Sequence, residues 1–181
     1  STTMTARWTS LVYGGGQFVA YQPSSGYGVM VSPDGVDWTE YNTDGSTNTG
    51  DLTYGENRYV RTDDHPALST GRVRYSDDGI NWSSANAPTT NYGKSSAYGN
   101  GKFVVVGGAT NDTKILVSET GNSDWTAVAS TSMPYYLDWE VVYFVNGYFV
   151  VISNEATSSP RTAISTDGFT WTAVDQVAST T

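Results

Sequence analysis

The sequence predicts an all-β fold made of four consecutive four-stranded antiparallel sheets. The first observation is a phrase of the form Ser-x-Asp-Gly-x-x-Trp that recurs along the chain, with its tryptophans, Trp38, Trp82, Trp125 and Trp171, spaced 44, 43 and 46 residues apart. The second is the composition, which includes 19 Gly and 13 Tyr among 181 residues and favours strands and turns over helices. Units of this length with four short strands each are typical of the blades of a small β-propeller.

Each unit opens with two short β-favouring stretches joined by a tight turn. In the first unit these stretches are residues 8–13 and 17–21, with three glycines between them. The equivalent turns at 55–57, 99–101 and 145–147 also contain Gly or Asn, which adopt the positive φ angles of tight hairpins at low cost. We therefore expect a β-hairpin at the start of every unit.

A third apolar stretch, the repeated phrase and a fourth stretch complete each unit. The blades are expected at about residues 8–41, 52–84, 95–128 and 139–174, in a single domain covering 1–181. We expect a monomeric ring of four blades; the alternative is two chains that together form one larger ring.

The repeated phrase is expected to hold the turn between the third and fourth strands. Its Asp accepts hydrogen bonds from the backbone of the turn, its Gly supplies the backbone angles, and its Trp covers the hairpin or packs on a neighbouring blade. The third copy has Thr120 in place of Asp and one extra residue before Trp125, so we expect its turn to be held most weakly. The structural positions are Ser32, Asp34, Gly35, Trp38, Ser76, Asp78, Gly79, Trp82, Ser118, Gly121, Trp125, Ser165, Asp167, Gly168 and Trp171.

The phrase resembles the Asp-box, or BNR repeat, of β-propellers in sialidases, some other glycoside hydrolases, sortilin-type receptors and a photosystem assembly factor. Its short spelling, preceded by stretches such as Tyr98-Gly-Asn-Gly-Lys-Phe-Val, is similar to repeats in bacteriophage tail and virion proteins. The resemblance spans roughly residues 8 to 174. It implies that the phrase is structural and lies at the periphery of the blades.

Charge and composition exclude several functional classes. The chain has 9 Lys and Arg against 18 Asp and Glu, a net charge of −9, which would repel the phosphates of nucleic acid. We therefore expect no nucleic-acid partner. We also expect no membrane insertion and no signal peptide, because no long apolar run is present. With no Cys, the fold must hold without disulfides.

Strand alternation assigns the connections to two faces of the propeller. The tight turns and the repeated phrases share one uniform face, while the connections between second and third strands and between blades share a varied face. Binding residues concentrate on loops of a rigid scaffold, so the varied face is the better candidate. The candidate binding residues are Tyr21, Tyr27, Tyr41, Asp63, Asp64, His65, Tyr92, Asn111, Asp112, Tyr135, Tyr136, Asn154 and Glu155. Exposed tyrosine rings there are suited to stacking on sugars or anchoring a protein; the alternative is that several close the protein's own core.

Catalytic and metal chemistry find little support. The resemblance to sialidases implies three clustered arginines, but Arg58 and Arg61 flank one strand and Arg72 and Arg74 alternate along another, which is typical of a solvated blade surface. His65 lies in an acidic loop that Asp112 or Glu155 could join in a metal site, but an isolated His in such a loop is more often solvated. We expect no catalytic residues, no metal and no cofactor.

The function we expect is that of a non-enzymatic structural or attachment protein of a bacteriophage virion, a tail or capsid decoration component made in the host cytoplasm. Its partners would be other virion proteins or a host-surface glycan, and a homo-oligomer is compatible with the repeats. The alternative is a stand-alone carbohydrate-binding propeller.

Overall fold

A computed structural model describes residues 8–22, 28–42, 50–63, 73–88, 93–107, 115–134, 137–154 and 161–174. It confirms the all-β fold: these residues form four separate four-stranded antiparallel sheets and one short 3-10 helix, η1 (Ser130–Ser132). In each sheet the strands follow one another in chain order. We name the sheets blades 1 to 4.

Every blade consists of four short strands of two to seven residues. Blade 1 contains β1 (Ser10–Gly14), β2 (Gln17–Gln22), β3 (Gly28–Ser32) and β4 (Thr39–Asn42). Blade 2 contains β5 (Leu52–Gly55), β6 (Arg58–Thr62), β7 (Val73–Ser76) and β8 (Ser83–Ser84). Blade 3 contains β9 (Ser95–Gly99), β10 (Lys102–Val106), β11 (Ile115–Ser118) and β12 (Thr126–Ala127). Blade 4 contains β13 (Trp139–Val145), β14 (Tyr148–Ser153), β15 (Thr162–Ser165) and β16 (Thr172–Ala173).

The first hairpin of every blade has the same geometry. In blade 2 the turn residues Glu56 and Asn57 have φ angles of 47° and 57°, so both adopt the left-handed conformation that a two-residue hairpin turn needs. Just before and after this turn, Tyr54 pairs with Tyr59 across the strands, and their ring centroids lie 4.6 Å apart. The other three blades carry an aromatic pair at the same register, which makes the hairpins structurally equivalent.

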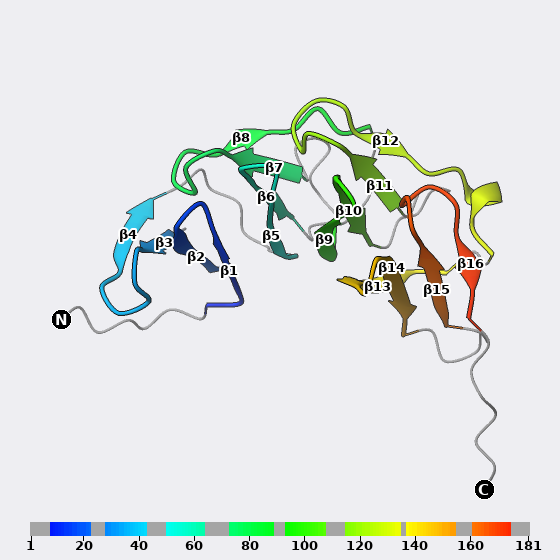
Figure 1. The fold of residues 1–181 in the computed structure, drawn as a ribbon. Helices are drawn as coiled ribbons and strands as arrows, with labels where there is room; N and C mark the ends of the chain where they lie inside the picture. The colour runs from blue at the N-terminus through cyan, green and yellow to red at the C-terminus, as the bar shows by residue number, and fades with distance from the viewer. Residues whose placement is uncertain are drawn as a thin grey trace, which may run out of the picture.

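The four blades stand side by side along an open arc (Figure 1). The first strands β1, β5, β9 and β13 line its inner side, each in contact with the next, and blades 1 and 4 lie apart at the two ends. The expectation of a closed ring of four blades is therefore wrong. Among the described residues, the strand contacts between blades join neighbouring blades, and Figure 1 shows the arc open between blades 1 and 4.

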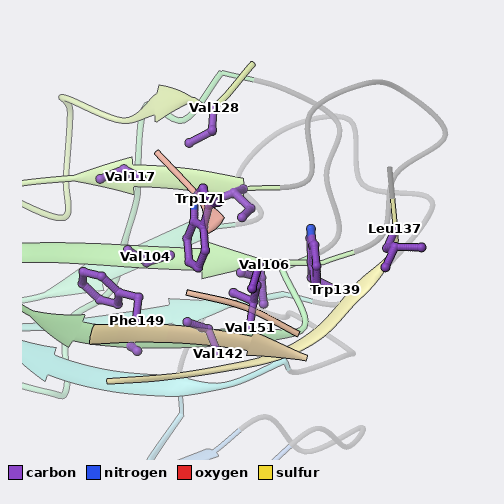
Figure 2. Close-up of a cluster of buried hydrophobic side chains, with 13 residues drawn as sticks. Val104, Val106, Val117, Val128, Leu137, Trp139, Val142, Phe149, Val151 and Trp171 are labelled. Carbon is purple, nitrogen blue, oxygen red and sulfur yellow. The ribbon is translucent and has the colours of Figure 1, made fainter. Parts of the chain in front are cut away.

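The core is divided into three apolar clusters, one between each pair of neighbouring blades. The largest lies between blades 3 and 4, where Val104, Val117, Phe149 and Trp171 interdigitate (Figure 2). Burial at these three seams is what holds the blades together, since no disulfide is available.

Candidate functional site

The turns formed by the repeated phrase, which we call the repeat turns, share a hydrogen-bond pattern. In the fourth, Ser165 Oγ accepts the N–H of Gly168 (2.8 Å) and donates to Asp167 Oδ1 (2.9 Å). The same carboxylate oxygen accepts the N–H groups of Phe169 and Thr170, both at 2.8 Å. The first and second turns repeat these bonds around Asp34 and Asp78. The Asp side chain is thus occupied by its own turn.

The tryptophan of the phrase closes the turn from the other side. Trp171 Nε1 donates to the carbonyl of Gly168 at 2.8 Å, and Trp38 and Trp82 bond Gly35 and Gly79 in the same way. Trp125 is buried in the blade 2–3 cluster, and its indole N–H has no hydrogen-bond partner among the described residues. The extra residue before Trp125 therefore changes the tryptophan contact.

The third repeat turn is not the weakly held one that we expected. Asp124, the residue just before the tryptophan, supplies the carboxylate that Thr120 lacks. It accepts hydrogen bonds from the hydroxyl groups of Ser118 and Thr120 and from the N–H groups of Glu119 (3.0 Å) and Thr120 (3.2 Å). Asp124 thus takes the role that the Asp of the phrase has in the other copies. The turn therefore keeps a buried serine, Ser118, a carboxylate and a positive-φ glycine, Gly121.

The repeat carboxylates are held in the charged form. Burial raises the pKa of Asp78, but the backbone and side-chain donors of Asn81, the N–H of Ile80 and the hydroxyl of Ser76 outweigh it and lower that pKa to about 2. The pKa of Asp34 is lowered by the N–H groups that it accepts. At Asp124 and Asp167 the pKa is likewise lowered, because hydrogen bonds prevail over burial. Carboxylates of this kind hold turns and do not exchange protons near neutral pH.

A buried ionic group at the blade 1–2 seam is the least expected feature. Arg61 is fully buried, whereas its position on the strand indicated a solvated surface. Its guanidinium carbon lies 4.2 Å from the ring centroid of Tyr21 and 5.1 Å from that of Trp82. Its Nε lies 3.4 Å from Asp63, which also accepts a hydrogen bond from Arg74 Nε at 3.2 Å. Two arginines on one carboxylate, packed on aromatic rings, make a chemically distinct seam.

A second polar group that the sequence did not indicate lies on the inner strands. The carboxylate of Asp51 accepts hydrogen bonds from Ser10 of blade 1 (3.2 Å) and from the hydroxyl of Ser95 and the N–H of Ser96 of blade 3 (both 3.1 Å). It therefore links three blades near the axis of the arc. The only signal in the sequence is its place directly before the first strand of its blade.

Of the predicted binding residues, the structure describes four. Tyr21 and Asp63 are buried in the seam just described, so they are not exposed as the loop interpretation required. Tyr41 is half-buried against the blade 1–2 cluster, and Asn154 is exposed after β14. The structure brings Tyr21 and Asp63 together around Arg61. The predicted positions that lie outside the described residues are Tyr27, Asp64, His65, Tyr92, Asn111, Asp112, Tyr135, Tyr136 and Glu155.

Over the ranges that the structure describes, no group of three or more His, Asp or Glu side chains is placed to hold a metal ion. The same ranges contain no helix that is long and apolar enough to cross a membrane.

The sequence matches no protein-family model and none of the curated proteins. Solved structures resemble it in fold. Virginiamycin B lyase from Staphylococcus aureus superposes with a TM-score of 0.72 at 12% identity, over 97% of this chain and 58% of the lyase. YCF48 bound to a D1 peptide gives 0.58 at 14% identity, over 92% of this chain and 52% of YCF48. The computationally designed Ika4 protein gives 0.61 at 14% identity, over 91% of this chain and 93% of Ika4.

These similarities define the class of the protein as β-propeller-like, and at such identities they show the fold alone. The chain spans little more than half the length of the lyase and of YCF48. It spans almost all of Ika4.

Proposed function

We propose that the chain is a non-enzymatic structural or attachment protein of a bacteriophage virion, a component of the tail or a capsid decoration. The observation that carries the non-enzymatic part is the state of the repeat carboxylates: each is committed to its own turn and has a lowered pKa. The bacteriophage part is supported by the resemblance of the repeated phrase to the short spelling of the Asp-box in repeats of tail and virion proteins. In this proposal the chain acts through contacts with other virion proteins or with the host surface.

An enzymatic role is the less favoured alternative. One protein of similar fold is a lyase by name, but it shares 12% identity with this chain. General acid–base catalysis works best with a group whose pKa is near the working pH, and the described carboxylates with perturbed pKa values are all shifted away from neutrality. The fold supports many functions, so the chemistry of the residues decides.

A carbohydrate-binding propeller is the second candidate. Tyr41 of blade 1 places an aromatic ring, and Asn154 of blade 4 an amide, at the ends of strands that face the varied loops; because they lie on opposite end blades, each would stack on or hydrogen-bond a sugar separately. YCF48, which shares the fold, is known in a complex with a peptide.

The virion proposal is tested by immunogold electron microscopy of particles purified from the source culture, with an antibody raised against this chain. We expect gold at one fixed position on the tail or capsid. Antibody absorbed beforehand with the purified chain is the control and should give no label. Intact particles that remain unlabelled, with the chain detected only in the soluble fraction of lysed cells, would refute the proposal.

The carbohydrate alternative is tested on a glycan array with the purified chain. If it holds, a small group of related glycans should bind, and Asn154→Ala should weaken binding while Ser83→Ala, on the exposed outer strand of blade 2, should not. An array without any bound glycan would eliminate this candidate.

A further inference from the structure

The two end faces of the arc carry the exposed apolar surface of the molecule. Within the described ranges, every exposed large hydrophobic side chain belongs to blade 1 or blade 4. Leu11 and Tyr13 of blade 1 and Tyr143 and Val145 of blade 4 are each between 57% and 60% exposed. Terminal units of repeat proteins normally present a polar outer face to water. In the part of the chain that the structure describes, these end faces carry exposed apolar side chains in place of such a cap, a feature typical of interaction surfaces.

The free face of blade 4 is equivalent to the faces by which blades 1, 2 and 3 pack against the blade that follows each of them. At each internal seam the glycine of a repeat turn sits on a valine of the preceding blade. A Cβ on Gly79, Gly121 or Gly168 would lie 2.7, 2.8 or 2.9 Å from Val19, Val60 or Val104, respectively. By strand register, the fourth member of this valine series is Val150 on the free face of blade 4.

The free face of blade 1 is equivalent to the faces by which blades 2, 3 and 4 pack against the blade before each of them. The three atoms nearest to a hypothetical Cβ on its repeat glycine, Gly35, belong to Phe18 of its own blade, whereas on the other repeat glycines the nearest atom belongs to the blade before. Asn146, in the tight turn of blade 4, is a matching donor. Its equivalent Asn100 donates through Nδ2 to the carbonyls of Gly147 (3.0 Å) and Thr166 (2.9 Å) across the blade 3–4 seam.

The two end faces differ in side-chain size from the internal seams: blade 4 has a large side chain where the other blades have small ones, and blade 1 has a hollow on its free face. On blade 4, Tyr143 stands where the other blades have Val12, Thr53 and Ala97, so this face carries a large projecting ring. Blade 1 has a hollow of about 380 Å³, lined by Trp8, Thr9, Ser10, Leu11, Ala20, Met30 and Trp38. In the blade 2–3 seam the equivalents of Tyr143 and Leu11 touch, because Thr53 Oγ1 lies 2.8 Å from Ser96 Oγ. The same geometry would direct Tyr143 into the hollow beside Leu11.

We propose that two copies of this chain join head to tail, blade 4 of each on blade 1 of the other, to form one ring of eight blades. Propellers with four to eight blades are known, so eight is within the range of the fold. This chain covers 52% and 58% of two longer propeller-like chains, which are thus long enough for more blades than the four of the arc. A two-fold axis closes the ring through two identical seams. This inference is independent of the proposed virion function.

One position shows that the seam between copies differs in detail from the internal ones. Gly14, Gly55 and Gly99 each receive an aromatic ring of the following blade, at 2.1 Å from a hypothetical Cβ. Blade 4 has Val145 at the equivalent position, and its side chain fills the space that Tyr13 of the second copy would otherwise occupy. In the proposed seam the large ring is instead supplied by Tyr143 from the opposite side.

The test begins with the mass of the purified chain, measured by light scattering and sedimentation at roughly 10 μM, above the Kd of most specific interfaces. We expect twice the 19.5 kDa of one chain. A single-chain mass would overturn the inference and assign the end faces to further blades or to another protein. A series of growing masses would overturn the closed ring, since it indicates open-ended association.

Cysteine pairing tests the geometry, because the chain has no Cys of its own. Chains with Leu11→Cys and chains with Tyr143→Cys are mixed and oxidised; we expect a disulfide-linked pair only in the mixture, because the internal equivalents are within disulfide reach. Cross-links between two Leu11→Cys chains would instead show like faces packed together and would refute the head-to-tail seam. Ser83→Cys mixed with Thr126→Cys, on exposed outer strands of blades 2 and 3, is the matched control and should not cross-link.

Charge insertion provides an independent readout. Leu11→Lys should raise the Kd of the pair at least about tenfold, because it buries an unpaired charge at both seams. Thr126→Lys adds the same charge away from the seam and should leave the Kd within about twofold. Far-UV circular dichroism establishes that both variants fold. Equal Kd values for the two folded variants would contradict the seam.

Discussion

The contact between an inner-strand glycine and the next blade allows one prediction to be worked in detail. Gly99 ends β9, and the ring of Phe144 occupies the space where a side chain at this position would begin. A Cβ at this position would be 2.1 to 2.3 Å from the Cγ, Cδ2 and Cδ1 atoms of Phe144, whereas carbon atoms in contact are about 3.5 to 4 Å apart. Gly99→Ala therefore forces the ring to retreat by roughly 1.5 Å or the blades to separate.

The expected cost of Gly99→Ala is about 3 kcal/mol, the upper part of the range for overpacking, because the ring is also fixed by Phe149, 4.9 Å away between centroids. Urea denaturation at one fixed protein concentration measures it. In the background of Phe144→Ala the same substitution should cost less than about 0.5 kcal/mol, since the space is then open. Thr126→Ala, on the exposed outer strand of blade 3 and away from every seam, is the control and should change stability by less than about 0.5 kcal/mol.

Two results would refute this reasoning. A loss below about 0.5 kcal/mol for Gly99→Ala would mean that the blades are not as closely spaced as the structure has them. A cost that persists in the Phe144→Ala background would place its origin in the strand itself rather than in the ring.

Three further predictions concern the repeat turns and the seams. Asp78→Ala should cost about 1–2 kcal/mol at pH 7, as expected for charge-assisted hydrogen bonds at an exposed turn. Because the folded pKa of Asp78 is depressed to about 2, its contribution is complete above roughly pH 4 and is lost as the pH falls through 2; urea titrations of wild type and variant should converge there. Trp171→Ala should cost about 3–5 kcal/mol, since the ring is 5% exposed in the blade 3–4 cluster; a thermal midpoint unchanged within error would contradict this. Arg61→Ala should cost about 3–5 kcal/mol because it leaves Asp63 buried with one cation fewer, and Asp63→Asn should then recover part of the loss; no recovery in the double variant would rule out the ionic explanation.

Local features of the fold could be predicted because they are encoded within each 44-residue unit. Strand pairs, tight turns and the repeated phrase depend on residues close in sequence, and all four sheets were expected in order. The exchange between Thr120 and Asp124 was missed although its signal was visible, an acidic residue moved to the place before Trp125. A carboxylate can bond the turn from the third position of the phrase or from the position before the tryptophan. Searching only for Asp at the third position missed the second arrangement.

Features that depend on how blades meet could not be predicted in the same manner. Arg61 looks like a surface arginine in its strand, and only the approach of Tyr21 from blade 1 makes its position buried. Closure of the ring depends on the rotation between neighbouring blades. This rotation is set by residues of two blades together and cannot be inferred from the sequence of one unit. The sequence did hold one hint: Val145 interrupts the series Gly14, Gly55 and Gly99, and so marks blade 4 as a unit whose outer face differs from those within the arc.

The three seams are built from one pattern but differ in chemistry, which explains how the blades keep their order. The blade 1–2 seam contains the buried Arg61 and Asp63, whereas the blade 2–3 and 3–4 seams have Val105 and Val151 at the position of Arg61. Packing a wrong blade on blade 1 would leave a charge unpaired or an aromatic site unfilled, and either costs several kcal/mol. Among the described residues, the end faces are apolar on their inner strands, and Glu40 lies at the outer edge of the blade 1 face. A chain that specifies its internal seams so distinctly while leaving two apolar half-seams open fits the ring of two copies proposed above, and the mass of the purified chain decides whether a second copy fills them.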